Sequence, residues 1–353
     1  MENVFLDTSI FVSENFLGKR ITSFLELCRD NYLQLVLSII TVNEVKSQYK
    51  KKARLAFDRH NELINDKEKV LRVLRNNTSV KDTIKKLPKV EDLCNEFYTK
   101  FDSKLKEAKA IIIEYPTINS EDIFKDYFEG KPPFNSTNKK HEFPDVIAII
   151  SIEKWCEECG DTCLLFSLDN DFKGRDSEFF EVRNDFDIYL ENNLKRISPA
   201  RIELVSALFN QDSENIDKDI REWVTNQLDD YTAYYEYTNW LDVHDVSIDE
   251  IKVQNKEYEI VSLNEEDVEI EIKAWVRVKV TLIVDDEETG IYDSEDKVMI
   301  YRDTTELVFE DEIELPINAR FFIADENDFD KNIEIEEIND GKNIELNRFW
   351  RNY

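Results

Sequence analysis

Four acidic residues stand where a short apolar run gives way to a helical pattern. They are Asp7 in FLDTS, Glu44 in TVNEV, Asp145 in FPDVIA and Asp169 in FSLDNDF. In an open parallel sheet, ligands bind outside the carboxyl ends of the strands, so carboxylates at successive strand-to-helix junctions converge on one edge. Carboxylates that lie close together repel one another unless a cation neutralises them. The sequence therefore predicts a divalent metal site at this edge.

The ligand types predict which metal binds. Carboxylates are hard ligands and no histidine stands among the four acids, so Mg²⁺ or Mn²⁺ is favoured over zinc. One or two such ions would activate a water and stabilise the leaving oxygen of a phosphodiester. A zinc alternative rests on Cys156, Cys159 and Cys163, but no histidine or second C-x-x-C lies nearby to complete a tetrahedral site. Because the five cysteines are an odd number at uneven spacing, free thiols are expected.

Each acid also has a structural interpretation when it is taken alone. Thr41 and Glu44 fit a capping box, in which the glutamate serves backbone amides of a helix. Asp145 in a first helical turn complements the helix dipole. Asp7 and Asp169 fit helix N-caps or Asx-turns. Their joint placement on one edge of one sheet favours the metal site.

Basic residues flank the predicted site in the sequence. Residues 46–60 carry six lysines and arginines against one acid, and they begin directly after Glu44. Exposed cations of this kind bind a phosphate backbone, although a solvated helix face and a polar loop are the alternative interpretation. His141, before Asp145, is a candidate proton donor, but a lone loop histidine is more often only solvated. The predicted nucleic-acid-binding residues are Lys50, Lys51, Arg54, Lys131, Lys139 and Lys140.

Short apolar runs alternate with longer helical patterns in the first half, which predicts a parallel sheet covered by helices. Strands are expected at 4–6, 33–37, 164–168 and, more weakly, 179–182. Helices are expected at about 9–29, 41–75, 81–113, 144–159 and 186–208. Residues 46–113 show no strand signal and are predicted to form a long helical hairpin that turns near 76–79. Residues 116–144 are predicted to be a loop.

The second half changes character after about residue 212. A helix is expected at about 214–230, and an aromatic segment follows at 231–240, for which acidic neighbours favour a core or interface role over base stacking. Every second position from Val268 to Val284 is apolar, which predicts antiparallel strands with one solvated face. We therefore expect an α/β domain at 1–210 and an acidic, β-rich (α+β) domain at 211–353.

Charge divides the chain in a similar way. Residues 201–353 hold 42 acidic against 15 basic residues, whereas residues 1–200 hold 35 against 31. A strongly acidic domain repels a polyanion, so nucleic acid is expected to bind the first half and a protein partner the second. No apolar run approaches the length of a membrane span and the N-terminus lacks a signal-peptide pattern, so a cytoplasmic location is expected.

The ordered combination of FLDTS, a glutamate near the start of the second helix, PDVIA and SLDNDF resembles the PIN-domain nucleases. The long helical insertion and the GKPP segment before KKHEFPD are similar to the larger bacterial PIN-like branch. The resemblance covers about residues 3–200 and implies a PIN-like α/β/α sandwich with a central parallel sheet, and metal-dependent cleavage of RNA or DNA. Its metal-holding acids carry over onto Asp7, Glu44, Asp145 and Asp169, with Asp171 as a fifth, and polar support onto Thr8, Ser9 and Ser167.

The leading functional hypothesis is an endonuclease that cuts single-stranded RNA with Mg²⁺ or Mn²⁺. The preference for RNA over DNA follows from the resemblance alone. A structure-specific DNA nuclease is the first alternative. A catalytically inactive PIN-like module that binds protein or nucleic acid is the second, although such a module has no need for clustered negative charge. The β-rich second half departs from the family and leaves the substrate and regulation open.

Overall fold

The computed structural model of the 353-residue chain forms two compact units, residues 1–190 and 191–353. It describes residues 1–64, 87–115, 120–130, 134, 143–169, 177–238, 243–263, 267–285, 289, 291–293, 298–301, 303–322 and 333–344. Several predicted features lie outside these residues, namely the turn at 76–79, Lys131, Lys139, Lys140, His141 and Asp171. The sequence-based boundary between two independently acting domains at 210 stays a prediction.

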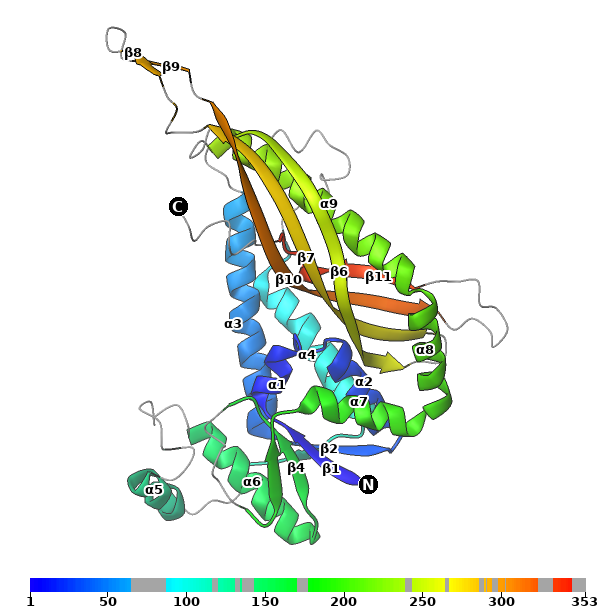
Figure 1. Ribbon diagram of the computed structural model, residues 1–353. Helices are drawn as coiled ribbons and strands as arrows, with labels where there is room; N and C mark the ends of the chain where they lie inside the picture. The colour runs from blue at the N-terminus through cyan, green and yellow to red at the C-terminus, as the bar shows by residue number, and fades with distance from the viewer. Residues whose placement is uncertain are drawn as a thin grey trace. The chain divides into compact units, whose positions relative to one another are not determined.

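A five-stranded parallel sheet forms the centre of the first unit, with strand order β3-β2-β1-β4-β5 (Figure 1). The strands are β1 (Glu2–Leu6), β2 (Leu33–Ser38), β3 (Ile111–Ile113), β4 (Cys163–Phe166) and β5 (Phe180–Arg183). The central strand β1 is almost wholly buried because it runs between β2 and β4 and is apolar on both faces. Helices flank the sheet, so the predicted α/β/α sandwich with a parallel sheet is confirmed.

The helices of this unit are α1 (Thr8–Ser13), α2 (Lys19–Arg29), α3 (Ile39–Ile64), α4 (Val90–Glu107), α5 (Ser120–Glu129), α6 (Phe143–Cys159) and α7 (Phe186–Ile197). The long helices α3 and α4 pack against each other, with Tyr49 stacked on Phe97 at a centroid distance of 3.7 Å. Phe97 also stacks on the buried Phe101, whose ring meets Phe11 of α1 edge to face. This aromatic core fixes α1 and α3 beside each other at the carboxyl end of β1.

Three predicted helices are wrong in their extent. The helix expected through residue 113 ends at Glu107, because Lys109 adopts a left-handed φ of 54° and three β-branched isoleucines then pair with β2 as β3. The helix expected at 9–29 is two helices, separated at Gly18, where an added Cβ would lie 2.2 Å from the Glu14 carbonyl oxygen. The helix expected at 186–208 breaks before Pro199, which begins α8 (Pro199–Gln211).

The segment expected to be a loop at 116–144 contains a helix. Helix α5 buries Ile123 and half-buries Tyr127, four residues apart on one face, against Phe134 and Val146. The prediction of a continuous loop was wrong because it followed the loop signal of the surrounding prolines and missed this short apolar helix face.

The second unit contains a four-stranded antiparallel sheet with strand order β11-β10-β7-β6. Its elements are α8, α9 (Ser213–Thr238), β6 (Val243–Leu263), β7 (Asp267–Asp285), the β8 (Ile291–Asp293) and β9 (Val298–Tyr301) pair, β10 (Thr304–Phe322), β11 (Glu334–Ile338) and the 3₁₀ turn Asn339–Gly341. Buried and half-buried residues alternate along β7, so the antiparallel sheet predicted from Val268 to Val284 is confirmed. Within the described ranges, none of the helices has the length and apolar character to cross a membrane.

Candidate active site

Asp7 is the first residue after β1, and it belongs to both the sheet edge and the start of α1. Its backbone N–H donates to the Phe166 carbonyl at 2.9 Å, which ties the ends of β1 and β4 together. Its side chain caps α1 by accepting the Ser9 N–H at 3.1 Å. The structural interpretation of Asp7 as an N-cap is therefore confirmed, and the same contacts place its buried carboxylate at the carboxyl edge of the sheet.

Two hydroxyl groups hold the same oxygen of this carboxylate. Ser9 Oγ donates to Asp7 Oδ2 at 2.6 Å, and the buried Ser167 Oγ donates to it at 3.0 Å. Together with the Ser9 amide, three donors fix the orientation of the Asp7 carboxylate. Between described residues, all three bonds end on Oδ2 and none on Oδ1.

The loop after β4 is fastened to this network. Ser167 Oγ accepts the Asp169 N–H at 3.0 Å, and Ser9 Oγ accepts the Leu168 N–H at 3.0 Å. Each hydroxyl thus donates its single proton to Asp7 and accepts a hydrogen bond from a backbone N–H of the loop. Asp169 is exposed, and its backbone is held through Ser167 to the same carboxylate. The structure therefore brings Asp7 and Asp169 into one hydrogen-bonded unit.

Glu44 joins the site from α3. Thr8 Oγ1 donates to Glu44 Oε2 at 3.1 Å, so the residue next to Asp7 holds the Glu44 carboxylate. Burial raises the pKa of Glu44, and the nearby charge of Asp7 raises this pKa further, whereas Thr8 and Lys51 lower it. A cation would stabilise the charged form of Glu44, which burial and the neighbouring Asp7 carboxylate both disfavour.

The capping-box interpretation of Thr41 and Glu44 is wrong. Ser38 Oγ accepts the Thr41 N–H at 3.0 Å and lies 2.9 Å from the Thr41 hydroxyl, so Ser38 caps α3 and the helix begins at Ile39. Glu44 then lies in the second turn, too far along for the third helical position that a capping box requires. The signal for this cap is a serine directly before the helical pattern, which the sequence-based prediction missed.

Asp145 lies half-buried in the first turn of α6, where it complements the helix dipole as expected. Helix α6 packs against β2 and against α3, the helix that carries Glu44. Among the described residues, no group of three or more acids, histidines or cysteines is placed so that it could hold a metal ion. Of the predicted acids, Asp7 lies near enough to Glu44 for its charge to raise the Glu44 pKa.

The predicted basic residues of α3 are exposed, as binding to a phosphate backbone requires. Lys50, Lys51 and Arg54 all face solvent. The charge of Lys51 lowers the pKa of Glu44, so positive potential from this helix reaches the Glu44 carboxylate. The structure therefore places basic side chains next to the candidate site on α3.

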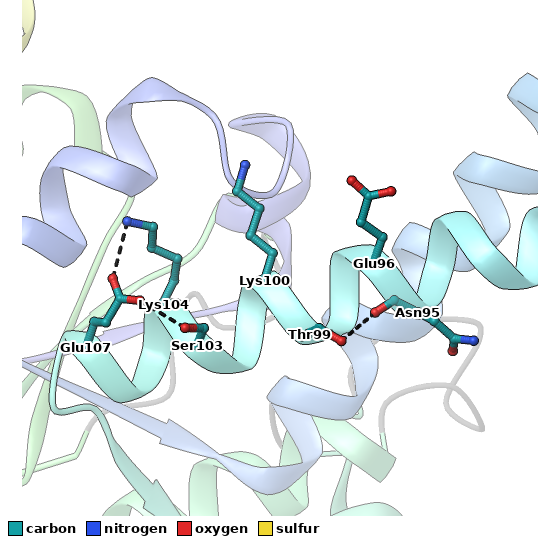
Figure 2. Close-up of a pocket in the computed structure, with 7 residues that line it drawn as sticks. All are labelled: Asn95, Glu96, Thr99, Lys100, Ser103, Lys104 and Glu107. Atoms are coloured by element: carbon teal, nitrogen blue, oxygen red, sulfur yellow. Dashed lines mark hydrogen bonds and ion pairs between the residues drawn. The ribbon is translucent and has the colours of Figure 1, made fainter. Parts of the chain in front are cut away.

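The cysteines and a surface hollow are separate from this site. All five thiols are free, and burial raises the pKa of Cys156 to about 11, which disfavours the thiolate that zinc needs. A shallow hollow of about 550 Å³ lies along the polar face of α4 (Figure 2). Its lining has as many lysines as glutamates, and Glu107 forms a salt bridge with Lys104 and accepts a hydrogen bond from Ser103. Neither feature includes a predicted acid.

Comparison with known families gives one match. Residues 4–172 match a family model described as a PIN domain, and comparisons with curated proteins and with solved structures give no match. The matched stretch begins in β1 and ends just beyond Asp169, so it contains all four acids of the predicted site. PIN domains are generally nucleases, and the parallel sheet with carboxylates at its carboxyl edge agrees with that fold. Residues 4–172 of this chain are therefore similar to PIN domains.

Proposed function

We propose that this protein is a metal-dependent endonuclease that cleaves phosphodiester bonds in single-stranded RNA. The observation that carries the proposal is the pairing of Asp7 and Glu44, which interact across the ends of β1 and β2 through Thr8. A buried carboxylate beside a half-buried one is costly without a counter-ion. The match to a PIN-domain model over the same residues supports a catalytic role for this carboxylate pair.

The chemistry of the site fits Mg²⁺ or Mn²⁺. Its donors are carboxylate and hydroxyl oxygens, which are the ligands that hard divalent cations prefer. The raised pKa of Glu44 fits as well, because a nearby cation would offset both the burial and the charge of Asp7. The residues proposed to hold the metal are Asp7, Glu44, Asp145 and Asp169, with Asp171 as a fifth. When bound, the metal supplies an activated water and stabilises charge on the leaving oxygen.

The other residues of the site position these groups and the substrate. Ser9 and Ser167 orient the Asp7 carboxylate, and Thr8 orients that of Glu44. The proposed phosphate-binding residues are Lys50, Lys51 and Arg54 on α3, with Lys131, Lys139 and Lys140 from the segment before Asp145. Cations at these positions would fix the register of the strand without reading its bases.

The second unit is proposed to bind a protein partner rather than the substrate. Its sheet places basic side chains against acids, with Lys273 on Glu259 at 2.9 Å and Arg320 on Glu336 at 2.8 Å. Cations that are engaged in this way do not attract a phosphate backbone, and residues 201–353 carry a large excess of acids. A basic surface on another protein is the complementary partner.

A matched cleavage panel tests the function. The full-length protein is incubated with single-stranded RNA, single-stranded DNA, duplexes and a flap DNA of the same sequence, in Mg²⁺, Mn²⁺ or EDTA. We expect metal-dependent cuts inside the single-stranded RNA, lost in Asp7→Asn and kept in Asp92→Asn, an exposed acid in the first turn of α4. Cleavage of the flap alone would assign a DNA nuclease instead. Binding without cleavage under every condition would leave an inactive PIN-like module.

A further inference from the structure

Three exposed aromatic side chains lie on segments that contact the elements of the proposed site. Tyr115, Phe124 and Phe128 are 67%, 49% and 78% exposed, although rings of this size are usually buried. Tyr115 follows β3, and the two phenylalanines stand one turn apart on α5. Exposed rings cost free energy in water, and a ligand that covered them would recover it.

Tyr115 is connected to the Glu44 side of the site. Its hydroxyl accepts a hydrogen bond from Asn43 Nδ2 at 3.2 Å, and Asn43 directly precedes Glu44 on α3. Since β3 pairs in parallel with β2, its end lies at the same carboxyl edge of the sheet as the end of β2. The exposed ring therefore stands beside the helix that carries Glu44.

Phe124 and Phe128 are connected to the Asp145 side of the site. The Phe124 ring meets Phe143 edge to face at 6.2 Å, and Phe143 is the first residue of α6, two positions before Asp145. Three residues further along α5, Tyr127 stacks on the same Phe143 ring at 5.5 Å. Packing thus holds α5 against the first turn of α6, while the Phe124 and Phe128 rings, 6.3 Å apart, remain open to solvent.

The size of the exposed surface favours a small planar ligand. With ~200 Å² for each phenylalanine side chain, the exposed fractions of Phe124 and Phe128 leave roughly 250 Å² of apolar surface. A stable protein interface needs about 800 Å² on each partner. The exposed neighbours Glu121, Lys125 and Glu129 interrupt any larger apolar patch. One or two nucleobases match this area, because every base presents a flat π face.

We propose that Tyr115, Phe124 and Phe128 form a stacking site for unpaired bases of a single-stranded nucleic acid. This inference rests on the proposed function and adds to it the reason for selecting single strands, since bases inside a duplex cannot reach the rings. The exposed charges of α5 are mostly acidic, so its rings contribute through stacking and not through phosphate contacts. Their contribution to affinity is therefore independent of salt, in contrast to that of the lysines on α3.

Binding without cleavage tests the stacking site. The full-length protein is titrated in EDTA against labelled single-stranded RNA, single-stranded DNA and duplex of one sequence, and the anisotropy is measured at several salt concentrations. The variants are Phe124→Ala with Phe128→Ala, Phe124→Trp with Phe128→Trp, and Tyr115→Ala. The control is Tyr32→Ala, which removes a 46% exposed ring that directly precedes β2 and so lies at the opposite edge of the sheet.

We expect the double alanine variant to bind single strands tenfold or more weakly, with an unchanged salt slope, and Tyr115→Ala to weaken binding less. The double tryptophan variant should keep or increase the affinity, and Tyr32→Ala should leave it unchanged. Wild-type affinity in the double alanine variant would overturn the stacking site. The nuclease proposal would be unaffected, because the cleavage panel tests it separately. An equal loss for duplex, or a dimer that the alanines dissociate, would also overturn it. Absence of any binding by the wild type would overturn the stacking site, whereas the cleavage panel alone decides the nuclease proposal.

Discussion

Replacing Ser167 with alanine is expected to reduce the free energy of unfolding by about 2–3 kcal/mol. The Ser167 side chain is 3% exposed, and its hydroxyl donates to the Asp7 carboxylate and accepts the Asp169 N–H. Loss of a hydrogen bond to a charged group costs about 1.5–3 kcal/mol. The Asp169 amide adds little, because the exposed loop lets water replace its acceptor. The larger part of the loss therefore comes from Asp7.

A second buried serine provides the matched control. Ser151 is 1% exposed on α6, and its hydroxyl donates to the Ile147 carbonyl one turn earlier, at 2.6 Å. Alanine removes this bond but leaves the carbonyl within the helix ladder, and alanine has the higher helix propensity. Ser151→Ala should therefore change the free energy of unfolding by less than about 1 kcal/mol.

Urea unfolding of both variants, followed by far-UV circular dichroism in EDTA, measures the difference. Cleavage of single-stranded RNA is then compared at a temperature where both variants are folded, and Ser167→Ala should be slower because Asp7 has lost one of three orienting donors. Equal urea midpoints for Ser167→Ala and Ser151→Ala would refute the reasoning. The Asp7 carboxylate would then owe its orientation to the Ser9 contacts alone.

Three further predictions concern the charged residues. The folded protein binds the Glu44 proton more tightly than the unfolded chain does, so the free energy of unfolding should fall as pH rises from the ordinary glutamate pKa through the raised one. At neutral pH in EDTA, Glu44→Gln should therefore be more stable than wild type. Without metal, Asp145→Asn should melt at no lower a temperature than wild type; it should be stabilised less by Mn²⁺ and should cut little RNA. The control Asp92→Asn should lose up to about 1 kcal/mol of stability and keep its activity. If Asp145→Asn instead lost stability and kept its activity, Asp145 would only complement the helix dipole. Replacing Lys139 and Lys140 by alanine should weaken RNA binding evenly across sequences and reduce the salt slope by about one for each lost contact, which titrations at several salt concentrations measure.

The central strands could be predicted from the sequence because burial on both faces leaves a continuous apolar run. VFL in β1 and LQLVL in β2 are such runs, and both strands form where they were expected. The isoleucines of β3 escaped prediction because three residues are too few to show a period, and only pairing with β2 makes them a strand. In α5, the helix depends on packing against Phe134 and α6, which no local pattern reveals.

The candidate site shows the same division between local and tertiary information. Asp7 and Glu44 could be associated from the sequence because each follows a strand, and adjacent parallel strands bring such residues to one edge. The role of Ser167 required the resemblance, since its bond to Asp7 joins residues far apart in the chain. The cap at Ser38 was misassigned to Thr41 because both residues carry the hydroxyl that a cap needs, and only the hydrogen-bond direction separates them.

The two central carboxylates are held in different ways, and the difference bears on how a cation would bind. Asp7 receives three hydrogen bonds on one oxygen, so its geometry is set by the fold whether or not a metal is bound. Glu44 receives a hydrogen bond from Thr8 and loses solvation, and its pKa is raised. In the proposed site, metal binding would displace a proton from Glu44 at pH values below its raised pKa, which would couple metal affinity to pH. Asp7 would then be the ligand of fixed orientation, and Glu44 the ligand whose charge depends on the metal.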